Sequence, residues 1–446
     1  MPVPRRSRTL RAAVASIALA AALAGCTGSS AGGAQDDPNA PVTLTFWHGW
    51  SAPAEVAAVD ANIARFREAH PHITVKAVPN VTDDKIQQAL RAGGSGAPDV
   101  VSSFTTDNVG RFCASGALAD LSPFIGKSGI DLAKTFPKAR LDYTQFDGVR
   151  CALPLLGDAY GLYYNKDAFA QAGVTAPPRT WSEFDRVAQK LTKHRGDSYE
   201  RLGFMPVFHG YETTPGHLAA QWQPTYFDAD GRSAVATDPA FAAMFTWQKN
   251  LVAKLGGFRK LEKYRGTFGD EWGARHPFHT GQVAMQLDGE WRLGMTADAK
   301  VPFEVGVAPL PVPDDQAGDY GKGYLSGTIV GIASTSAKQN AAWQLVKYLT
   351  TDTDAVVAFA NELRNVPSTH AALASPKLRL DPRFRVFLDI ARHPRSSTTP
   401  ASVNGGAYQV TLQEFGYRYE SGREPDLRAG LERTAAQIDT DIAKAR

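Results

Sequence analysis

Three groups of residues in this chain have types and spacings that catalysis or metal binding can use. Gly28 to Gly32 matches the Gly-x-Ser-x-Gly pattern of a nucleophilic serine, but it lies in a Gly- and Ser-rich stretch without the strand and helix that such a serine needs. The close histidine pairs His70 and His72, and His276 and His279, have prolines between their members, which spoils a helical metal site. We therefore interpret the serine motif as chance and expect the four histidines at the surface.

Nucleotide hydrolysis and sugar hydrolysis have no better support in the sequence. The chain contains no Walker A motif, so we expect no nucleotide chemistry in it. Glycoside hydrolysis needs two facing carboxyl groups about 5 to 10 Å apart, and no motif singles out such a pair, although Asp158 could be one member. We expect no cofactor, no metal and no catalysis.

The N-terminus carries an export pattern. Four arginines within residues 5–11 precede an unbroken small and apolar run from Ala12 to Ala24, which is too short for an ordinary membrane span. The run closes at Leu23-Ala24-Gly25-Cys26, and in this it resembles a bacterial lipoprotein. The resemblance implies that residues 1–25 are a signal peptide and that Cys26 is acylated and anchors the chain outside the cytoplasmic membrane. A plain secreted protein remains the alternative, and Arg5-Arg6 leaves a twin-arginine export route open.

Charge and cysteine content suit an exported protein that does not bind nucleic acid. Removal of residues 1–25 takes away four arginines and no acid, which lowers the formal net charge from +3 to about −1. Such a charge recruits no nucleic acid. Besides Cys26 the chain has only Cys113 and Cys151, and because an oxidising compartment favours disulfides we expect these two to pair. The alternative is two free thiols.

The apolar patterns predict an α/β fold. After a flexible tether at 26–41, Val42 to Trp47 is a strand pattern, Val56 to Phe66 has helical spacing, and further short strands follow near 73–78 and 98–101. This alternation predicts mostly parallel sheets flanked by helices. Thr180 with Glu183 is a capping box at a helix start, and we expect residues 181–296 to be largely helical. No long linker follows residue 41, which favours a chain that crosses between two domains more than once.

Six segments in this order resemble the extracellular solute-binding proteins of ABC importers, in the carbohydrate-binding group that includes maltose-binding protein. They are 45–50 (TFWHGW), 97–101 (APDVV), 154–167 (PLLGDAYGLYYNKD), 180–184 (TWSEF), 281–291 (GQVAM to GEW) and 365–368 (NVPS). The resemblance implies a type II binding-protein fold, with two lobes joined by hinge crossings around a cleft. It places lobe 1 at 42–155 plus 307–352 and lobe 2 at 156–306 plus 353–446.

The same resemblance suggests which side chains contact a ligand. A sugar offers apolar C–H faces and hydroxyl edges, so aromatic rings and polar groups are expected together. The candidates are His48, Trp50 and Ser51 after the first strand, Phe104, Asp107 and Asn108 after the third, Asp158 and Tyr160 at the first crossing, and Trp222, Trp272, Trp291, Tyr324 and Arg364 further on. Core packing is the alternative for the rings, capping for Asp107 and Asp158, and a surface ion pair for Arg364.

The resemblance implies a receptor that captures a di- or oligosaccharide and delivers it to membrane permease subunits, with the ATPase on another chain. A monomer is expected. A receptor for a glycerophosphodiester is an alternative within the same family, with Arg364 or His48 as candidates for the phosphate. A secreted carbohydrate-active enzyme is the alternative from another class.

Overall fold

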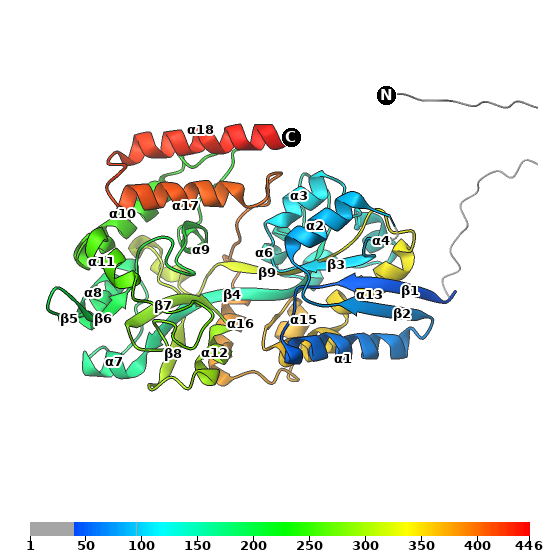
Figure 1. The fold of residues 1–446 in the computed structure, drawn as a ribbon, viewed down its shortest axis with the longest axis horizontal. Helices are drawn as coiled ribbons and strands as arrows, with labels where there is room; N and C mark the ends of the chain where they lie inside the picture. The colour runs from blue at the N-terminus through cyan, green and yellow to red at the C-terminus, as the bar shows by residue number, and fades with distance from the viewer. Residues whose placement is uncertain (1–39, 95) are drawn as a thin grey trace, which may run out of the picture. The chain divides into compact units, whose positions relative to one another are not determined.

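One mixed β-sheet runs through the computed structural model, which describes residues 40–94 and 96–446 (Figure 1). Its strand order is β2-β1-β3-β9-β4-β7-β6-β5, with β8 and β10 also paired to β4. The strands are β1 Val42–Trp47, β2 Ile73–Val78, β3 Val100–Ser103, β4 Leu153–Asn165, β5 Lys193–Arg195, β6 Ser198–Phe204, β7 Val283–Gly289, β8 Val305–Ala308, β9 Leu325–Ile332 and β10 Val366–Pro367. Cys26 and most of the expected tether lie outside the described residues.

Strand β4 joins two lobes. Its first half, from Leu153 to Ala159, pairs with β9, and its second half pairs with β7 and β8. Lobe 1 is built around β1, β2 and β3, with one apolar cluster on each face of the sheet. Lobe 2 is built around β6, β7 and β8 with a larger apolar cluster. The expected α/β class with two lobes and hinge crossings is confirmed, and the sheet is mixed because β9 and β4 run antiparallel to every strand they pair with.

Helices cover both faces of this sheet. In Figure 1, α1 lies on the opposite side of β1 from α2 and α3. The α-helices are α1 Pro53–Ala69, α2 Asp83–Ala92, α3 Asn108–Ala114, α4 Ser122–Lys127, α5 Leu132–Thr135, α6 Lys138–Asp142, α7 Lys166–Gln171, α8 Trp181–Leu191, α9 Pro215–Ala219, α10 Pro239–Lys254, α11 Phe258–Arg265, α12 Arg292–Asp298, α13 Gln339–Thr351, α14 Thr353–Leu363, α15 His370–Leu373, α16 Arg385–Arg392, α17 Ala407–Glu420 and α18 Leu427–Ala445, with 3-10 turns η1 Asp314–Asp319 and η2 Pro382–Phe384. No helix among the described residues is long and apolar enough to cross a bilayer.

Local sequence signals explain several of these helices. On α1 the apolar residues Val59, Ile63 and Phe66 recur at helical spacing and are buried on one face. The Thr180 side chain accepts a hydrogen bond from the backbone N–H of Glu183, and the Glu183 carboxylate accepts one from Arg179 N at 2.8 Å. The Thr180 cap of α8 is therefore present, whereas the Glu183 carboxylate bonds to Arg179 N instead of the Thr180 N–H that a full capping box requires.

Two sequence expectations need correction. Residues 181–296, expected to be largely helical, contain β5, β6 and β7. All seven residues of β7 are buried, and a strand covered on both faces shows no alternation of apolar and polar residues.

The lobe boundaries also shift. Strand β8 pairs with the second half of β4, and Val312 N donates to Arg179 O at 3.1 Å, so residues 307–324 pack with lobe 2 rather than lobe 1. Helix α14 packs on α1 and α13 and adds Phe359 and Ala360 to the core of lobe 1. It was expected in lobe 2, and the last crossing therefore follows α14.

Candidate functional site

Four aromatic rings from four segments meet beside β4. The ring of Tyr160 lies 5.2 Å from that of Tyr324 and 5.4 Å from that of Trp291, centroid to centroid, and both contacts are edge-to-face. His217 on α9 lies 4.4 Å from Tyr160 and 4.9 Å from Tyr324. The structure thus brings three of the predicted site residues together with His217, which the sequence analysis missed.

Trp291 is held in place by the glycine that ends β7. A Cβ at Gly289 would lie 2.3 Å from carbons of the Trp291 ring, so no larger residue fits under it. Trp272, another predicted residue, lies 6.2 Å from Trp291 on the outer side, and the Arg292 guanidinium lies 5.7 Å from the Trp272 ring. The rings of Trp272, Trp291, Tyr160 and Tyr324 therefore form a continuous series.

Phe104, Trp272 and Val410 are the exposed large apolar side chains among the described residues, with 47%, 57% and 61% of their surface accessible. Phe104 rests edge-on against Trp50 at 5.2 Å, as Trp272 rests near Trp291. Isolated exposed apolar side chains are common on protein surfaces. Exposed rings backed by a second aromatic side chain are the kind of surface that binds the C–H face of a ligand.

Asp158 and Glu290 form a buried carboxyl pair where β4 passes between the lobes. Glu290 Oε2 accepts a hydrogen bond from Ala159 N at 2.9 Å, and Asp158 accepts from Asn365 Nδ2 at 3.3 Å and from Ser326 Oγ at 3.4 Å. Burial and then the charge of Asp158 raise the pKa of Glu290 well above its usual value, and burial also raises the pKa of Asp158. Two carboxyl groups in contact hold one proton between them.

Arg140 places a buried positive charge beside the carboxyl pair. Its guanidinium is fully buried, and its three nitrogens have no hydrogen-bond partner among the described residues. It packs directly on Gly157, where a Cβ would lie 1.2 Å from Nη1. The positive charge of Arg140 opposes the burial effect and lowers the pKa of Asp158. The same charge also lowers the pKa of Glu290.

Glu212 and His217 form a second polar pair beside the rings. His217 Nδ1 lies 2.7 Å from the Glu212 carbonyl oxygen, which makes Nδ1 the protonated nitrogen and leaves Nε2 as an acceptor. Burial lowers the pKa of His217 to about 4. Burial first, and then the charges of Asp288 and Glu271, raise the pKa of Glu212 to about 8. The 3.3 Å contact between the Glu212 carboxyl and Nδ1 is therefore a contact between neutral groups at pH 7.

Asp107 joins lobe 1 to lobe 2. Gln409 Nε2 on α17 donates to Asp107 Oδ1 at 2.6 Å, and the Thr399 hydroxyl also bonds to this carboxylate. Thr399 Oγ1 lies 3.2 Å from the Tyr324 hydroxyl, which continues the chain of hydrogen bonds to the aromatic series. Burial raises the pKa of Asp107.

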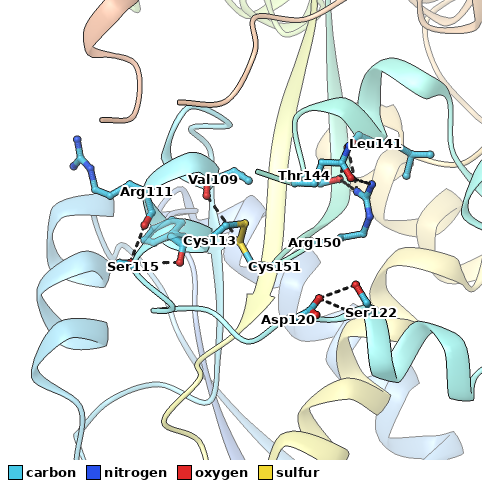
Figure 2. Close-up of a disulfide and its surroundings, with 12 residues drawn as sticks. Val109, Arg111, Cys113, Ser115, Asp120, Ser122, Leu141, Thr144, Arg150 and Cys151 are labelled. Atoms are coloured by element: carbon cyan, nitrogen blue, oxygen red, sulfur yellow. Dashed lines mark hydrogen bonds between the residues drawn. A yellow bond between two sulfur atoms is a disulfide. The ribbon is translucent and has the colours of Figure 1, made fainter. Parts of the chain in front are cut away.

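The disulfide between Cys113 and Cys151 is present, with an S–S distance of 2.08 Å (Figure 2). It ties α3, which begins just after Asp107, to the residues that lead into β4. On the same approach to β4, Arg150 donates to Thr144 Oγ1 at 2.5 Å. Figure 2 shows both the disulfide and the hydrogen bond between Arg150 and Thr144. The expected cysteine pairing is confirmed. The bond holds α3, which Asp107 precedes, near β4, which contains Asp158.

Other predicted residues lie apart from this cluster. His48 is fully buried between Phe46 and Trp50, with ring distances of 5.4 and 5.6 Å. Ser51 is exposed, and its backbone N donates to Glu55.

Of three further candidates, two are buried away from the aromatic series and the third lines a different cavity. Asn108 is buried and bonds to Gln87 at 3.1 Å and to Asp83 at 3.0 Å. Trp222 stacks on Trp181 at 4.9 Å in the core of lobe 2. Arg364 lines a separate cavity that also contacts Glu290.

The expectation of surface histidines is wrong for the second pair. His276 and His279 are 0% and 4% exposed, and their rings lie 5.0 Å apart. They lie in the turn that leads into the buried strand β7, and burial lowers the pKa of both. The described residues contain no group of three or more His, Cys, Asp or Glu side chains that could hold a metal ion.

A cavity of about 200 Å³ opens beside the aromatic series. It is lined by Tyr324, Tyr226, Gly216 and Thr398, among others, and so combines rings with hydroxyl and backbone groups. The sequence analysis missed Glu212, Glu290 and Gln409. Glu290 stands next to Trp291 within a recognised segment, which was the one available signal, whereas nothing local marks Glu212 or Gln409.

Comparison with known proteins agrees with this geometry. The chain is 23% identical over 380 residues to the maltotriose-binding protein of Pyrococcus abyssi, covering 83% of this chain and 78% of that protein. It is 25% identical over 286 residues to the sn-glycerol-3-phosphate-binding periplasmic protein UgpB of Brucella abortus, covering 60% and 62%. The solved structure of CpMnBP1 with mannotriose bound superimposes with a TM-score of 0.74 at 24% identity, covering 89% of this chain and 99% of that one.

The family assignment rests on a match to most of the chain. The bacterial extracellular solute-binding proteins match residues 50–356, a range that contains β2 to β9 and therefore parts of both lobes. These are extracytoplasmic binding proteins. This chain belongs to the bacterial extracellular solute-binding protein family.

Proposed function

We propose that this protein is the lipid-anchored receptor of an ABC importer and that it captures a di- or oligosaccharide between its lobes. The observation that carries the proposal is the aromatic series Trp272, Trp291, Tyr160 and Tyr324 beside the Asp158–Glu290 pair. The rings provide surfaces for the C–H faces of consecutive sugar units. The carboxyl pair provides hydrogen-bonding groups for hydroxyls.

Burial makes these polar groups selective. A ligand that lacks the matching hydroxyls leaves desolvated groups unpaired, at a cost of about 1 to 3 kcal/mol each. Ligand that contacts both lobes favours the closed form by its additional contacts there. The closed protein then docks on permease subunits, and ATP is hydrolysed by another chain.

A glycerophosphodiester receptor is the second candidate. Its support is the similarity to UgpB, a relative whose name states a glycerol phosphate ligand. The aromatic series favours the sugar, because a glycerol chain has no flat face to place against consecutive rings.

The enzyme alternative has weaker support. Asp158 and Glu290 are neighbouring carboxyl groups whose pKa values are both raised by burial. Sugar hydrolysis needs carboxyl groups about 5 to 10 Å apart with the bond to be cleaved between them. The arrangement of Asp158 and Glu290 suits hydrogen bonding to a ligand rather than cleavage of a glycosidic bond.

The test is a thermal-shift screen of the purified protein against mono-, di- and oligosaccharides and glycerophosphocholine, followed by calorimetry of the hits. A ligand that binds only the folded state raises the melting temperature. Stabilisation by a di- or oligosaccharide supports the proposal, and stabilisation by glycerophosphocholine alone replaces it with the second candidate. Stabilisation by none of them contradicts both.

The anchor is tested separately. Expression of the full chain in a bacterium with labelled palmitate should label the wild type and leave Cys26→Ser unlabelled. Equal labelling of the two chains would contradict acylation at Cys26.

A further inference from the structure

Two arginines line a cavity between α12 and the end of α14. The cavity has a volume of about 340 Å³, and its walls include Leu293 and Gly294 from α12, Phe384 from η2, and the side chains of Arg364 and Arg379. Neither guanidinium makes an ion pair or a hydrogen bond with any of the described residues. Both arginines are solvent-exposed at the mouth of this cavity, and neither has a counter-ion among the described residues.

The acids on the cavity wall do not neutralise these arginines. Asp381 accepts two hydrogen bonds from the Arg383 guanidinium, at 3.0 and 2.7 Å, so its charge is already paired. Glu290 also reaches the wall, and burial followed by the charge of Asp158 raises its pKa well above the usual value. The cavity consequently carries an excess positive charge.

The backbone holds both arginines at this place. Arg364 ends α14 in the left-handed conformation, with φ 54° and ψ 47°, where glycine is the usual residue. Arg379 N donates to Asn361 Oδ1 at 2.7 Å, and Asn361 Nδ2 donates to Lys377 O at 2.9 Å. Asn361 on α14 thus fastens the Arg379 loop to the helix that Arg364 ends.

The opposite wall is apolar and comes from the other lobe. Leu293 and Gly294 belong to α12 of lobe 2, whereas α14 packs in lobe 1. A Cβ at Gly294 would lie 3.7 Å from Arg364 Nη1, so the missing side chain leaves open space directly in front of that guanidinium.

We propose that this cavity binds an oxyanion, a phosphate or carboxylate group, through Arg364 and Arg379. A guanidinium offers paired N–H donors that match the two oxygens of such a group. An oxyanion between two guanidiniums supplies the counter-charge that the chain lacks here. The site is separate from the aromatic series, so the proposal does not depend on which sugar binds there.

The test is calorimetric titration of the purified protein with inorganic phosphate, glucose 1-phosphate and glucose at low ionic strength. The double variant Arg364→Gln/Arg379→Gln removes the donors, and Gly294→Leu fills the cavity while keeping both charges. Leucine also suits a helix better than glycine, so the fold should be retained. Arg232→Gln/Arg428→Gln is the control, because it makes the same charge change at two exposed ion pairs.

We expect at least a tenfold loss of oxyanion affinity in both cavity variants and none in the control. If the cavity variants lose affinity for inorganic phosphate, the cavity is a site for a free anion. If the cavity variants lose affinity for glucose 1-phosphate alone and bind glucose as the wild type does, the anion is part of the ligand. Absence of oxyanion binding, or equal loss in cavity and control variants, overturns the proposal. Sugar binding with no oxyanion effect would refute this site and leave the proposed function standing.

Discussion

Trp291 is the side chain whose loss should affect ligand affinity most. It touches Tyr160 and lies between that ring and Trp272. Trp291→Ala should weaken binding of the sugar identified in the screen at least tenfold, which corresponds to about 1.4 kcal/mol, while the protein stays folded. Calorimetry measures the affinity, and circular dichroism checks the fold.

The matched control for this variant is Trp343→Ala. Trp343 packs on Phe124 in lobe 1 and donates to Ser128 Oγ at 2.8 Å, away from the site. Its loss should lower stability and leave the affinity unchanged. An unchanged affinity in Trp291→Ala would remove that ring from the binding site.

Glu212 makes stability depend on pH. Its pKa in the folded protein is about 8, compared with the ordinary value of 4.5. Below pH 4.5 the carboxyl group is protonated in both states, so its contribution to stability is complete. As the pH rises towards 8 the unfolded chain ionises first, and the contribution is lost, at up to about 1.4 kcal/mol per pH unit.

Glu212→Gln should therefore flatten the loss of stability between pH 4.5 and 8. Urea unfolding of both proteins at several pH values measures the difference. Glu414→Gln is the control, because this carboxylate is half exposed at the edge of lobe 2. Parallel pH profiles for the wild type and Glu212→Gln would show that Glu212 is ionised in the folded protein.

At the scale of elements, the disulfide fastens α3 to the start of β4. The bonded cysteines are separated by 38 residues, and a loop of that length predicts a stabilisation of about 4 kcal/mol. The double variant Cys113→Ser/Cys151→Ser should lose most of this and keep a sugar affinity close to that of the wild type. Guanidinium unfolding measures the stability, and mass spectrometry under non-reducing conditions checks the bond.

Two outcomes would contradict this view of the disulfide. Free thiols in the exported wild-type protein would show that the bond does not form. A loss of sugar affinity in the folded double variant would show that the bond positions Asp107 and Asp158 as well as stabilising the chain.

Elements with strong local signals were predictable, and fully buried strands were not. Helix α1 has one apolar face, and α8 has Thr180 with Glu183 at its start, so both follow from the spacing of a few residues. Strand β7 is buried along its whole length and shows no such pattern. The helical expectation for 181–296 failed there for that reason.

At the scale of the whole molecule, Gln409 provides a contact between the lobes. Its side chain on α17 donates to Asp107 beside α3. If ligand affinity depends on closure, Gln409→Ala should weaken sugar binding about fivefold, since a hydrogen bond contributes about 1 kcal/mol. Calorimetry with the same sugar measures the change.

Gln413→Ala is the control on the same helix. Its side chain lies 3.2 Å from His209 Nδ1, and both residues belong to lobe 2. The control should bind sugar like the wild type. Equal affinities for the wild type and Gln409→Ala would show that the contact between Asp107 and Gln409 does not contribute to closure.

The sequence by itself determined the family, the α/β class, the cysteine pairing and the four members of the aromatic series, because these follow from local motifs and from residue type. Only the tertiary structure decided which side chains meet. Ala159 and Glu290, joined by a hydrogen bond, are 131 residues apart, and Asp107 and Gln409 are 302 apart. Such pairs depend on strand register and on where the chain crosses between the lobes. The buried carboxyl pair and its single proton arise from that register, since neither Asp158 nor Glu290 carries a local signal for the other.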